Sequence, residues 1–356
     1  MSEIKEFVEI SKYAGERFDL VQAAGGNSSV KLDNGEMLIK ASGFLLSDVK
    51  ENAGYSRVFT APVAAIVKNG QIIDSRNKRE RESLTAQLLK EATIDKQNRP
   101  SIETLLHSLL LKYTLHTHSI VVNMIVVRDN CKEILDTIFK DDAIALVPYE
   151  TPGIELAIAL DKELNKFETT PKIIILQNHG LIVTSDEKDD IERLTEYVLK
   201  KIETYLDIDM SKYKLTNSIS RLMERIGDST NLSYLSEDMF LNEQLQKNNK
   251  LFSNTPFCPD TFVYCGVNPV RIDSLSDTKS LLDYQKESHE LPKVIVYDNK
   301  LFFIGSTLKK AKEMEEVLKF HIMALAQNET EKLNFLATDE LNYLSNWEAE
   351  KYRQEL

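Results

Sequence analysis

Apolar residues recur at helical spacing in several segments of the chain, and each of these segments predicts an amphipathic helix. The first covers residues 3–20, where Ile4, Phe7 and Ile10 fall on one side. Further helices are predicted over residues 80–93, 103–113, 189–206 and 307–327. A charged helix that carries the single tryptophan, Trp347, is predicted over residues 339–356.

Runs of β-branched and aromatic residues between these segments predict strands. Two hairpins are expected: residues 30–32 pair with 37–40, and residues 172–176 pair with 181–184. The run 115–127 is dominated by β-branched residues and predicts one buried strand. Strands are also expected around residues 261–264, 293–297 and 301–304. Helices and strands therefore intermix along the chain.

The length of 356 residues exceeds the usual size of one domain and predicts two. Residues 207–254 are polar and rich in Asn, Ser and Lys, as connecting regions often are. We place the boundary near Phe252, which gives domains of residues 1–251 and 252–356.

The formal net charge is −12, and no dense cluster of Lys and Arg is present, so nucleic acid is not an expected partner. The longest apolar runs, such as residues 120–127, are too short to span a bilayer, and the first residues contain no apolar signal region. We therefore predict no membrane partner and a cytoplasmic protein.

Three cysteines, Cys131, Cys258 and Cys265, are an odd number without Cys-x-x-Cys spacing. This pattern argues against a disulfide framework and against a metal site built from thiolates. We expect reduced, structural cysteines.

Two histidines alternate with a threonine, as His116-Thr117-His118, inside the predicted apolar strand. Alternate strand residues face the same side of a sheet, so both imidazoles point into one space and could bind one metal ion. In isolation, such a pair more often consists of partly buried structural histidines. Four of the six histidines fall within residues 107–179, however, and this concentration favours a metal site.

His179, between Asn178 and Gly180 at the tip of a predicted hairpin, is the candidate third ligand. Glycine permits the tight turn that returns a side chain toward the sheet. Three neutral imidazoles leave a coordination position open for a substrate oxygen, as in catalytic zinc sites, although they also suit other divalent transition metals. We therefore predict a Zn²⁺ site at these three histidines.

Glu103 begins the predicted helix that leads into the strand of His116. An acid in a first turn usually complements the helix dipole. Its alternative role is that of a general base, which takes a proton from the carbon next to a metal-bound carbonyl. His107 follows one helical turn later on the same face, and we interpret it as a supporting or core residue rather than a ligand.

Small residues form two turns, Gly26-Asn27-Ser28-Ser29 and Ala41-Ser42-Gly43. Their backbone N–H groups and short hydroxyls could together bind a phosphate or a carboxylate. Each is an ordinary turn by itself, but their repetition favours an anion site.

These motifs, in this order, resemble the class II aldolase/adducin superfamily. The ordered set comprises Gly26-Asn27-Ser28-Ser29, Lys40-Ala41-Ser42-Gly43, Pro100-Ser101-Ile102-Glu103, His116-Thr117-His118 and Asn178-His179-Gly180. Residues 99–107, Cys258-Pro259-Asp260 and the segment around Trp347-Glu348 resemble the aldolase part of bacterial rhamnulose-1-phosphate aldolase/short-chain dehydrogenase fusion proteins.

The resemblance implies an α/β protein: a three-layer α/β/α fold with a mainly antiparallel central sheet, followed by a smaller C-terminal α/β domain. Homo-oligomeric assembly, usually as a tetramer, is implied as well. For the site, it implies Zn²⁺ on His116, His118 and His179, with Glu103 as the catalytic acid/base. The residues expected to bind the substrate phosphate are Asn27, Ser42, Gly43 and Ser101, together with Ser28 from the first turn.

The implied activity is that of a zinc-dependent lyase that cleaves a ketose 1-phosphate similar to rhamnulose 1-phosphate, reversibly, to dihydroxyacetone phosphate and an aldehyde. Sugar-phosphate epimerases and dehydratases of the same superfamily, and non-catalytic scaffolds similar to adducin, are alternatives. Sugar-phosphate aldolases of this family commonly carry two serines before the glutamate, whereas here Ile102 follows Ser101. The sequence contains no Gly-x-Gly-x-x-Gly motif, so we predict no NAD binding.

Overall fold

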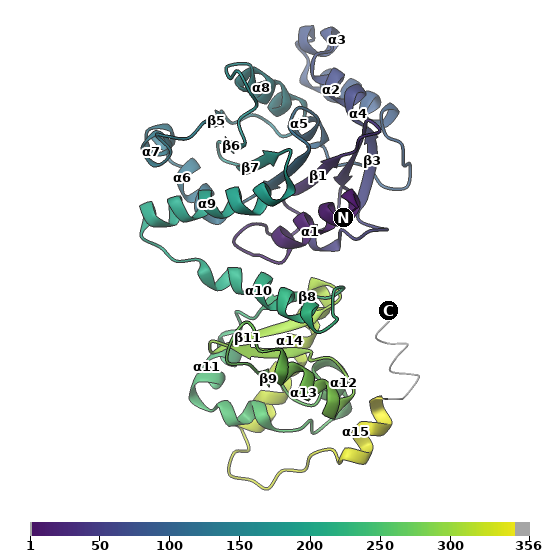
Figure 1. The fold of residues 1–356 in the computed structure, drawn as a ribbon, viewed down its shortest axis with the longest axis vertical. Helices are drawn as coiled ribbons and strands as arrows, with labels where there is room; N and C mark the ends of the chain where they lie inside the picture. The colour runs from purple at the N-terminus through teal and green to yellow at the C-terminus, as the bar shows by residue number, and fades with distance from the viewer. Residues whose placement is uncertain (1, 346–356) are drawn as a thin grey trace. The chain divides into compact units, whose positions relative to one another are not determined.

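The computed structural model describes residues 2–345, which form two compact units (Figure 1). The chain divides between Met210 and Ser211. Each unit has its own sheet, and apolar cores pack against that sheet within each unit.

A seven-stranded sheet forms the centre of the first unit. In spatial order its strands are β3 (Tyr55–Phe59), β2 (Glu36–Lys40), β1 (Asn27–Lys31), β4 (Tyr113–Thr117), β7 (Gly180–Ser185), β6 (Ile173–Leu176) and β5 (Ile144–Val147). All neighbouring strands are antiparallel except β5 and β6. Strand β4 lies in the middle, and all of its residues are buried.

Helices cover both faces of this sheet, because each face carries a separate apolar core. Leu115 and Val183 lie in the core that is covered by α1 (Glu3–Gly15), α6 (Ile120–Val126), α7 (Cys131–Ile138) and α9 (Lys188–Leu206). Ile39 and Ile182 lie in the core that is covered by α2 (Thr60–Val67), α3 (Gly70–Asp74), α4 (Lys78–Glu91), α5 (Thr104–Ser108) and α8 (Ile154–Leu164). A 3₁₀ helix, η1 (Leu46–Asp48), lies against α1. The three-layer α/β/α fold with a mainly antiparallel sheet is thus confirmed.

The two predicted hairpins are confirmed as β1–β2 and β6–β7. The single strand predicted over residues 115–127 is wrong beyond Thr117, where β4 ends and α6 soon follows. Four β-branched residues of α6 are buried: Val121, Val122, Ile125 and Val126. Their spacing matches one helix face, and burial of that face outweighs the modest helix propensity of β-branched residues. The helix predicted over residues 103–113 is also shorter, because it ends at Ser108.

The second unit contains a smaller sheet of four strands. Their order is β8 (Leu232–Leu235), β11 (Lys300–Gly305), β10 (Val294–Tyr297) and β9 (Val270–Arg271). The described helices are α10 (Ser211–Arg225), α11 (Met239–Lys247), η2 (Asn249–Ser253), α12 (Pro259–Cys265), α13 (Thr278–Ser288), α14 (Leu308–Ala326) and α15 (Thr338–Ser345). Phe303, Leu318 and Ile322 lie in the core of this unit.

The polar segment 207–254 is structured rather than a connection, since most of it forms α10, β8, α11 and η2. Leu232, Leu241 and Leu245 from this segment lie in the second core. The compact units therefore divide earlier in the chain than the boundary that we placed near Phe252.

A strand predicted around residues 261–264 is wrong, because these residues belong to helix α12. Pro259 begins that helix, where a fixed φ and a missing N–H suit the first turn. The predicted C-terminal helix is described as α15 as far as Ser345, and Trp347 lies outside the described residues.

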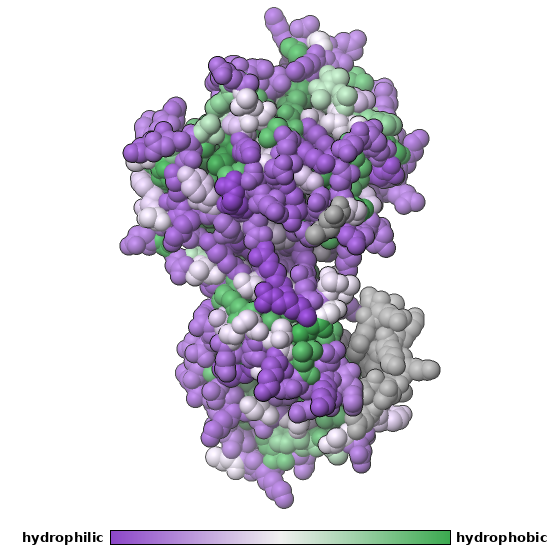
Figure 2. Space-filling model, viewed as in Figure 1, coloured by the Kyte–Doolittle hydropathy of each residue, from purple (hydrophilic) through white to green (hydrophobic). Residues whose placement is uncertain are grey.

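Hydrophilic residues dominate the surface seen in Figure 2, and apolar residues form small groups on each unit. Among the described helices, none is both long enough and apolar enough to cross a membrane.

Gly180, at the start of β7, gives a test of this packing. A Cβ at this position would lie 2.1 Å from the carbonyl oxygen of Thr117, whereas a Cβ on Gly70 would meet no atom within 4 Å. We expect Gly180→Ala to lower the free energy of unfolding by about 1–3 kcal/mol. Gly70→Ala, the control, should change it by less than about 1 kcal/mol. Urea unfolding measures both, and equal effects would contradict the packing described here.

His321 gives a test of pH-dependent stability in the second unit. Its ring stacks on Phe257, with ring centroids 5.0 Å apart, and burial lowers its pKa from 6.5 to about 4. Between these two pH values the unfolded chain binds more protons, so the free energy of unfolding should fall as the pH drops through this window. His321→Phe keeps a stacked ring without a titrating group and should reduce that acid-induced loss by about 3 kcal/mol. Unchanged pH dependence in urea unfolding would count against this role.

Candidate metal centre

The three predicted histidine ligands lie in or beside the ends of two neighbouring strands of the central sheet, β4 and β7. His116 lies in β4, and His118 lies immediately after that strand. His179 lies in the turn between β6 and β7. Since β4 pairs with β7, with His116 opposite Ile182, this turn is brought beside the end of β4.

A tight turn aims the His179 side chain at β4. Asn178 adopts a left-handed backbone with φ of 53°, and the N–H of His179 donates to Leu176 O at 3.2 Å. The side chain of Asn123 in α6 donates to His179 O at 3.1 Å. The helix that replaces the predicted strand therefore helps to hold the ligand turn, a role that sequence reasoning missed.

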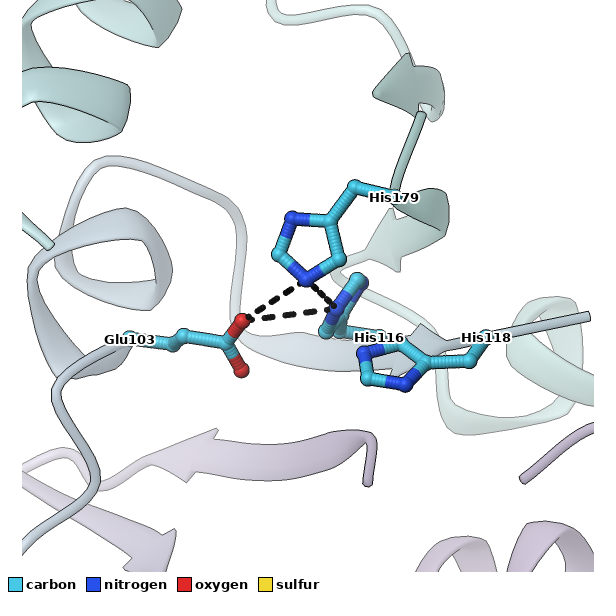
Figure 3. Close-up of side chains that lie close together, drawn as sticks. All are labelled: Glu103, His116, His118 and His179. Atoms are coloured by element: carbon cyan, nitrogen blue, oxygen red, sulfur yellow. Dashed lines mark hydrogen bonds and ion pairs between the residues drawn. The ribbon is translucent and has the colours of Figure 1, made fainter. Parts of the chain in front are cut away.

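The histidines converge with Glu103 on one small volume (Figure 3). The Nε2 atoms of His116 and His179 are 3.3 Å apart. Glu103 Oε1 lies 3.5 Å from Nε2 of His116 and 3.3 Å from Nε2 of His179. One potential ligand atom from each of the four residues lies within 4.8 Å of the others.

The protonation states suit metal binding. His116 Nδ1 lies 3.1 Å from Leu181 O, to which it donates, so Nε2 presents a lone pair to the cluster. Burial lowers the pKa of His116 to about 3, and it also lowers the pKa of His118. Both rings are therefore neutral at neutral pH, as metal ligands must be.

One buried polar atom supports the fit of a cation to this cluster. His118 Nε2 is buried and has no hydrogen-bond partner within the described structure. A buried polar atom without a partner is costly, and coordination of a cation would satisfy it. Three imidazoles beside a carboxylate are a donor set that fits a divalent transition metal.

Glu103 lies at the N-cap position of α5 and is buried. Its Oε2 accepts a hydrogen bond of 2.9 Å from the side-chain amide of Asn27. Burial opposes the charged carboxylate, but the His116 and His179 rings and the Asn27 amide outweigh it and hold the pKa of Glu103 below its usual range. The cluster therefore contains an ionised carboxylate that is able to accept a proton.

The structure also brings together most residues of the predicted phosphate site. Asn27 donates to Ser101 Oγ at 2.7 Å. The turn that holds Ser42 and Gly43 lies beside Ser101, because Ser42 N–H donates to Arg99 O at 2.9 Å and Ala41 bridges to Pro100.

Ser28 does not join this group. Its hydroxyl lies 2.7 Å from Ser11 Oγ of α1, which covers the opposite face of the sheet.

Lys40, which precedes the Ala41-Ser42-Gly43 turn, holds two loops together, a role that the sequence alone did not predict. Its buried Nζ donates to Phe44 O at 2.8 Å and to Ala24 O at 3.2 Å. Burial lowers the pKa of Lys40, and the nearby charge of Glu103 opposes that shift. A lysine at the end of the apolar run Met37-Leu38-Ile39 was the signal that could have revealed this contact.

The family match lies within the first unit. The family described as "Class II Aldolase and Adducin N-terminal domain" matches residues 5–206. A curated relative, "Uncharacterized oxidoreductase YuxG" of Bacillus subtilis (strain 168), is 25% identical over 222 residues, which are 60% of this chain. The match spans only 31% of that relative's length.

Solved structures give similar coverage. The N-terminal class II aldolase domain of a conserved protein from Thermoplasma acidophilum is 26% identical, with a TM-score of 0.49, over 58% of this chain and 94% of that chain. An L-fuculose 1-phosphate aldolase is 16% identical, with a TM-score of 0.39, over 60% of this chain and 95% of that chain.

His179→Ala tests the cluster as a metal site. If His179 is a ligand, its loss should reduce metal affinity by at least about ten-fold, because three-imidazole sites have no spare donor of equal strength. The exposed His289 supplies a control, and His289→Ala should leave metal binding unchanged. Metal content after purification without chelators, measured by mass spectrometry, compares the two variants. Equal occupancy would return His179 to the role of a turn residue.

Proposed function

This chain belongs to the class II aldolase and adducin family, and we propose that it is a metal-dependent lyase acting on a ketose 1-phosphate. The proposed reaction is reversible aldol cleavage to dihydroxyacetone phosphate and an aldehyde. The observation that carries the proposal is the convergence of three histidine side chains and one buried, ionised glutamate.

His116, His118 and His179 would hold the metal ion, and we propose Zn²⁺ as that ion. When bound, such a cation supplies Lewis-acid chemistry that draws electron density from a carbonyl group. The surrounding protein fixes the ligands beforehand, since the Leu181 carbonyl orients His116 and Asn123 holds the backbone of His179.

Glu103 is the proposed acid/base. In the direction of synthesis, its carboxylate takes a proton from the carbon next to the carbonyl of dihydroxyacetone phosphate, and in cleavage it returns that proton to the same carbon. The low pKa favours the ionised form that accepts the proton. The Asn27 amide holds Oε2, which leaves Oε1 directed at the histidines.

For the substrate phosphate, we propose contacts with Asn27, Ser42, Gly43 and Ser101. The proximity of the Ser42 turn to Ser101 supports a common site. Gly43 has a φ of 88°, and a Cβ added at this position would meet no atom within 4 Å. An anion can therefore approach its backbone closely. Ser28 is left out of this proposal, because its hydroxyl bonds to α1.

Metal analysis combined with an assay for dihydroxyacetone phosphate tests the function. The substrate panel should include rhamnulose 1-phosphate and fuculose 1-phosphate. About one zinc per chain and release of triose phosphate would support the lyase. Bound metal with an isomerised or dehydrated sugar phosphate would indicate an epimerase or a dehydratase, since only an aldolase makes two carbon fragments. A chain that binds no metal would be a scaffold.

Glu103→Gln separates the acid/base role from occupancy of the metal site. We expect this variant to take up close to one equivalent of metal when Zn²⁺ is in excess, at an affinity lowered by the loss of the charged carboxylate, and to lose at least about 100-fold in kcat, because the amide cannot accept the proton. Steady-state assays and metal analysis on the same preparation provide the measurement. Turnover equal to that of the wild type would remove Glu103 from the mechanism.

A further inference from the structure

One face of β1 makes polar contacts along the whole segment that carries Glu103. Asn27 contacts Ser101 and Glu103. Two residues further, Ser29 Oγ lies 2.7 Å from His107 Nδ1, and at the end of the strand Lys31 Nζ donates to Ser108 O at 2.9 Å. Because strand residues alternate between faces, the three β1 side chains lie on the same side of the sheet. They contact residues before, within and at the end of α5.

The contact between Ser29 and His107 is fully buried. Ser29 is 1% exposed and His107 is 0% exposed. Burial lowers the pKa of His107 to about 4, so the ring is neutral at neutral pH. This hydrogen bond ties the helix to the strand without a net charge.

Glu103 and His107 are joined by one turn of backbone, in which His107 N–H donates to Glu103 O at 3.3 Å. On its other side β1 pairs with β4, with Asn27 opposite His116 and Ser29 opposite Thr114. Strand β1 therefore pairs with the strand of His116 and, through Ser29 and His107, also contacts the turn that carries the backbone of Glu103.

We propose that Ser29 and His107 are positioning residues for Glu103. Asn27 orients the carboxylate end of Glu103, while the Ser29–His107 contact fixes the turn of α5 that carries its backbone. Together they hold Oε1 at 3.3–3.5 Å from the Nε2 atoms of His116 and His179. The effect on turnover rests on the proposed lyase function, whereas the effect on metal affinity does not.

Ser29→Ala tests the proposal, and Ser11→Ala is a matched control. Ser11 Oγ makes a buried contact of the same length, 2.7 Å, with Ser28 Oγ, and it ties β1 to α1 on the other face of the sheet. Each substitution deletes one buried hydroxyl between β1 and a helix. Both should lower thermal stability to a similar extent, but only Ser29→Ala disturbs the segment of Glu103.

The measurements are the Zn²⁺ dissociation constant, by chelator competition, and kcat and KM for the cleaved ketose 1-phosphate, all on the full chain. We expect Ser29→Ala to weaken Zn²⁺ binding and to lower kcat by about ten-fold each, with little change in KM. Ser11→Ala should leave both quantities at the wild-type level. Equal behaviour of the two variants would reduce the Ser29–His107 contact to a structural one and overturn the proposal.

A double-mutant cycle with Glu103→Gln shows whether the effect passes through Glu103. Ser29→Ala should weaken Zn²⁺ binding in the wild-type background and cause no further loss in the Glu103→Gln background. An equal loss in both backgrounds would overturn the proposal. If the wild type cleaves no ketose 1-phosphate, the proposed function fails, but the Zn²⁺ cycle still decides the positioning role.

Discussion

The pairing of β4 with its two neighbours is the constraint on which the centre depends. On one side β7 brings the turn of His179 to the end of β4, and on the other β1 places Asn27 opposite His116. Strand side chains alternate between faces, so a register shift of one residue would turn His116 toward the opposite core. The register of the paired strands therefore determines which residues lie beside one another at the centre.

Electrostatics then determines what this geometry can do. A buried carboxylate is costly unless hydrogen bonds compensate for its lost hydration. One carboxylate oxygen of Glu103 accepts a hydrogen bond from the Asn27 amide, and the other lies near the His116 and His179 rings. Burial disfavours the charged form of both groups, so the burial that opposes ionisation of the carboxylate also keeps the His116 ring neutral. The cluster thus contains both an ionised carboxylate that can act as a base and imidazole nitrogens whose lone pairs can bind a metal ion.

Much of this arrangement could be predicted from the sequence, because local signals agreed with the tertiary structure. Alternation predicted that His116 and His118 face one side, and the Asn-His-Gly turn predicted a hairpin at His179. The strand predicted over residues 120–127 was wrong, since β-branched runs suit a buried strand and a buried helix equally well until the packing partner is known. The orientation of Ser28 and the contact of Lys40 depend on which helix or loop covers each strand face, and one sequence does not contain that information.

Lys40 also connects two loops near the candidate metal centre. A single ammonium group holds two loops by their carbonyl oxygens, at Ala24 and Phe44. Ala24 directly precedes Gly25, which lies beside His118, and Phe44 directly follows Gly43. Neither loop can open without giving up a hydrogen bond of the same buried cation. The two loops therefore behave as one preorganised unit, and a ligand that binds there does not have to pay the conformational entropy of ordering them separately.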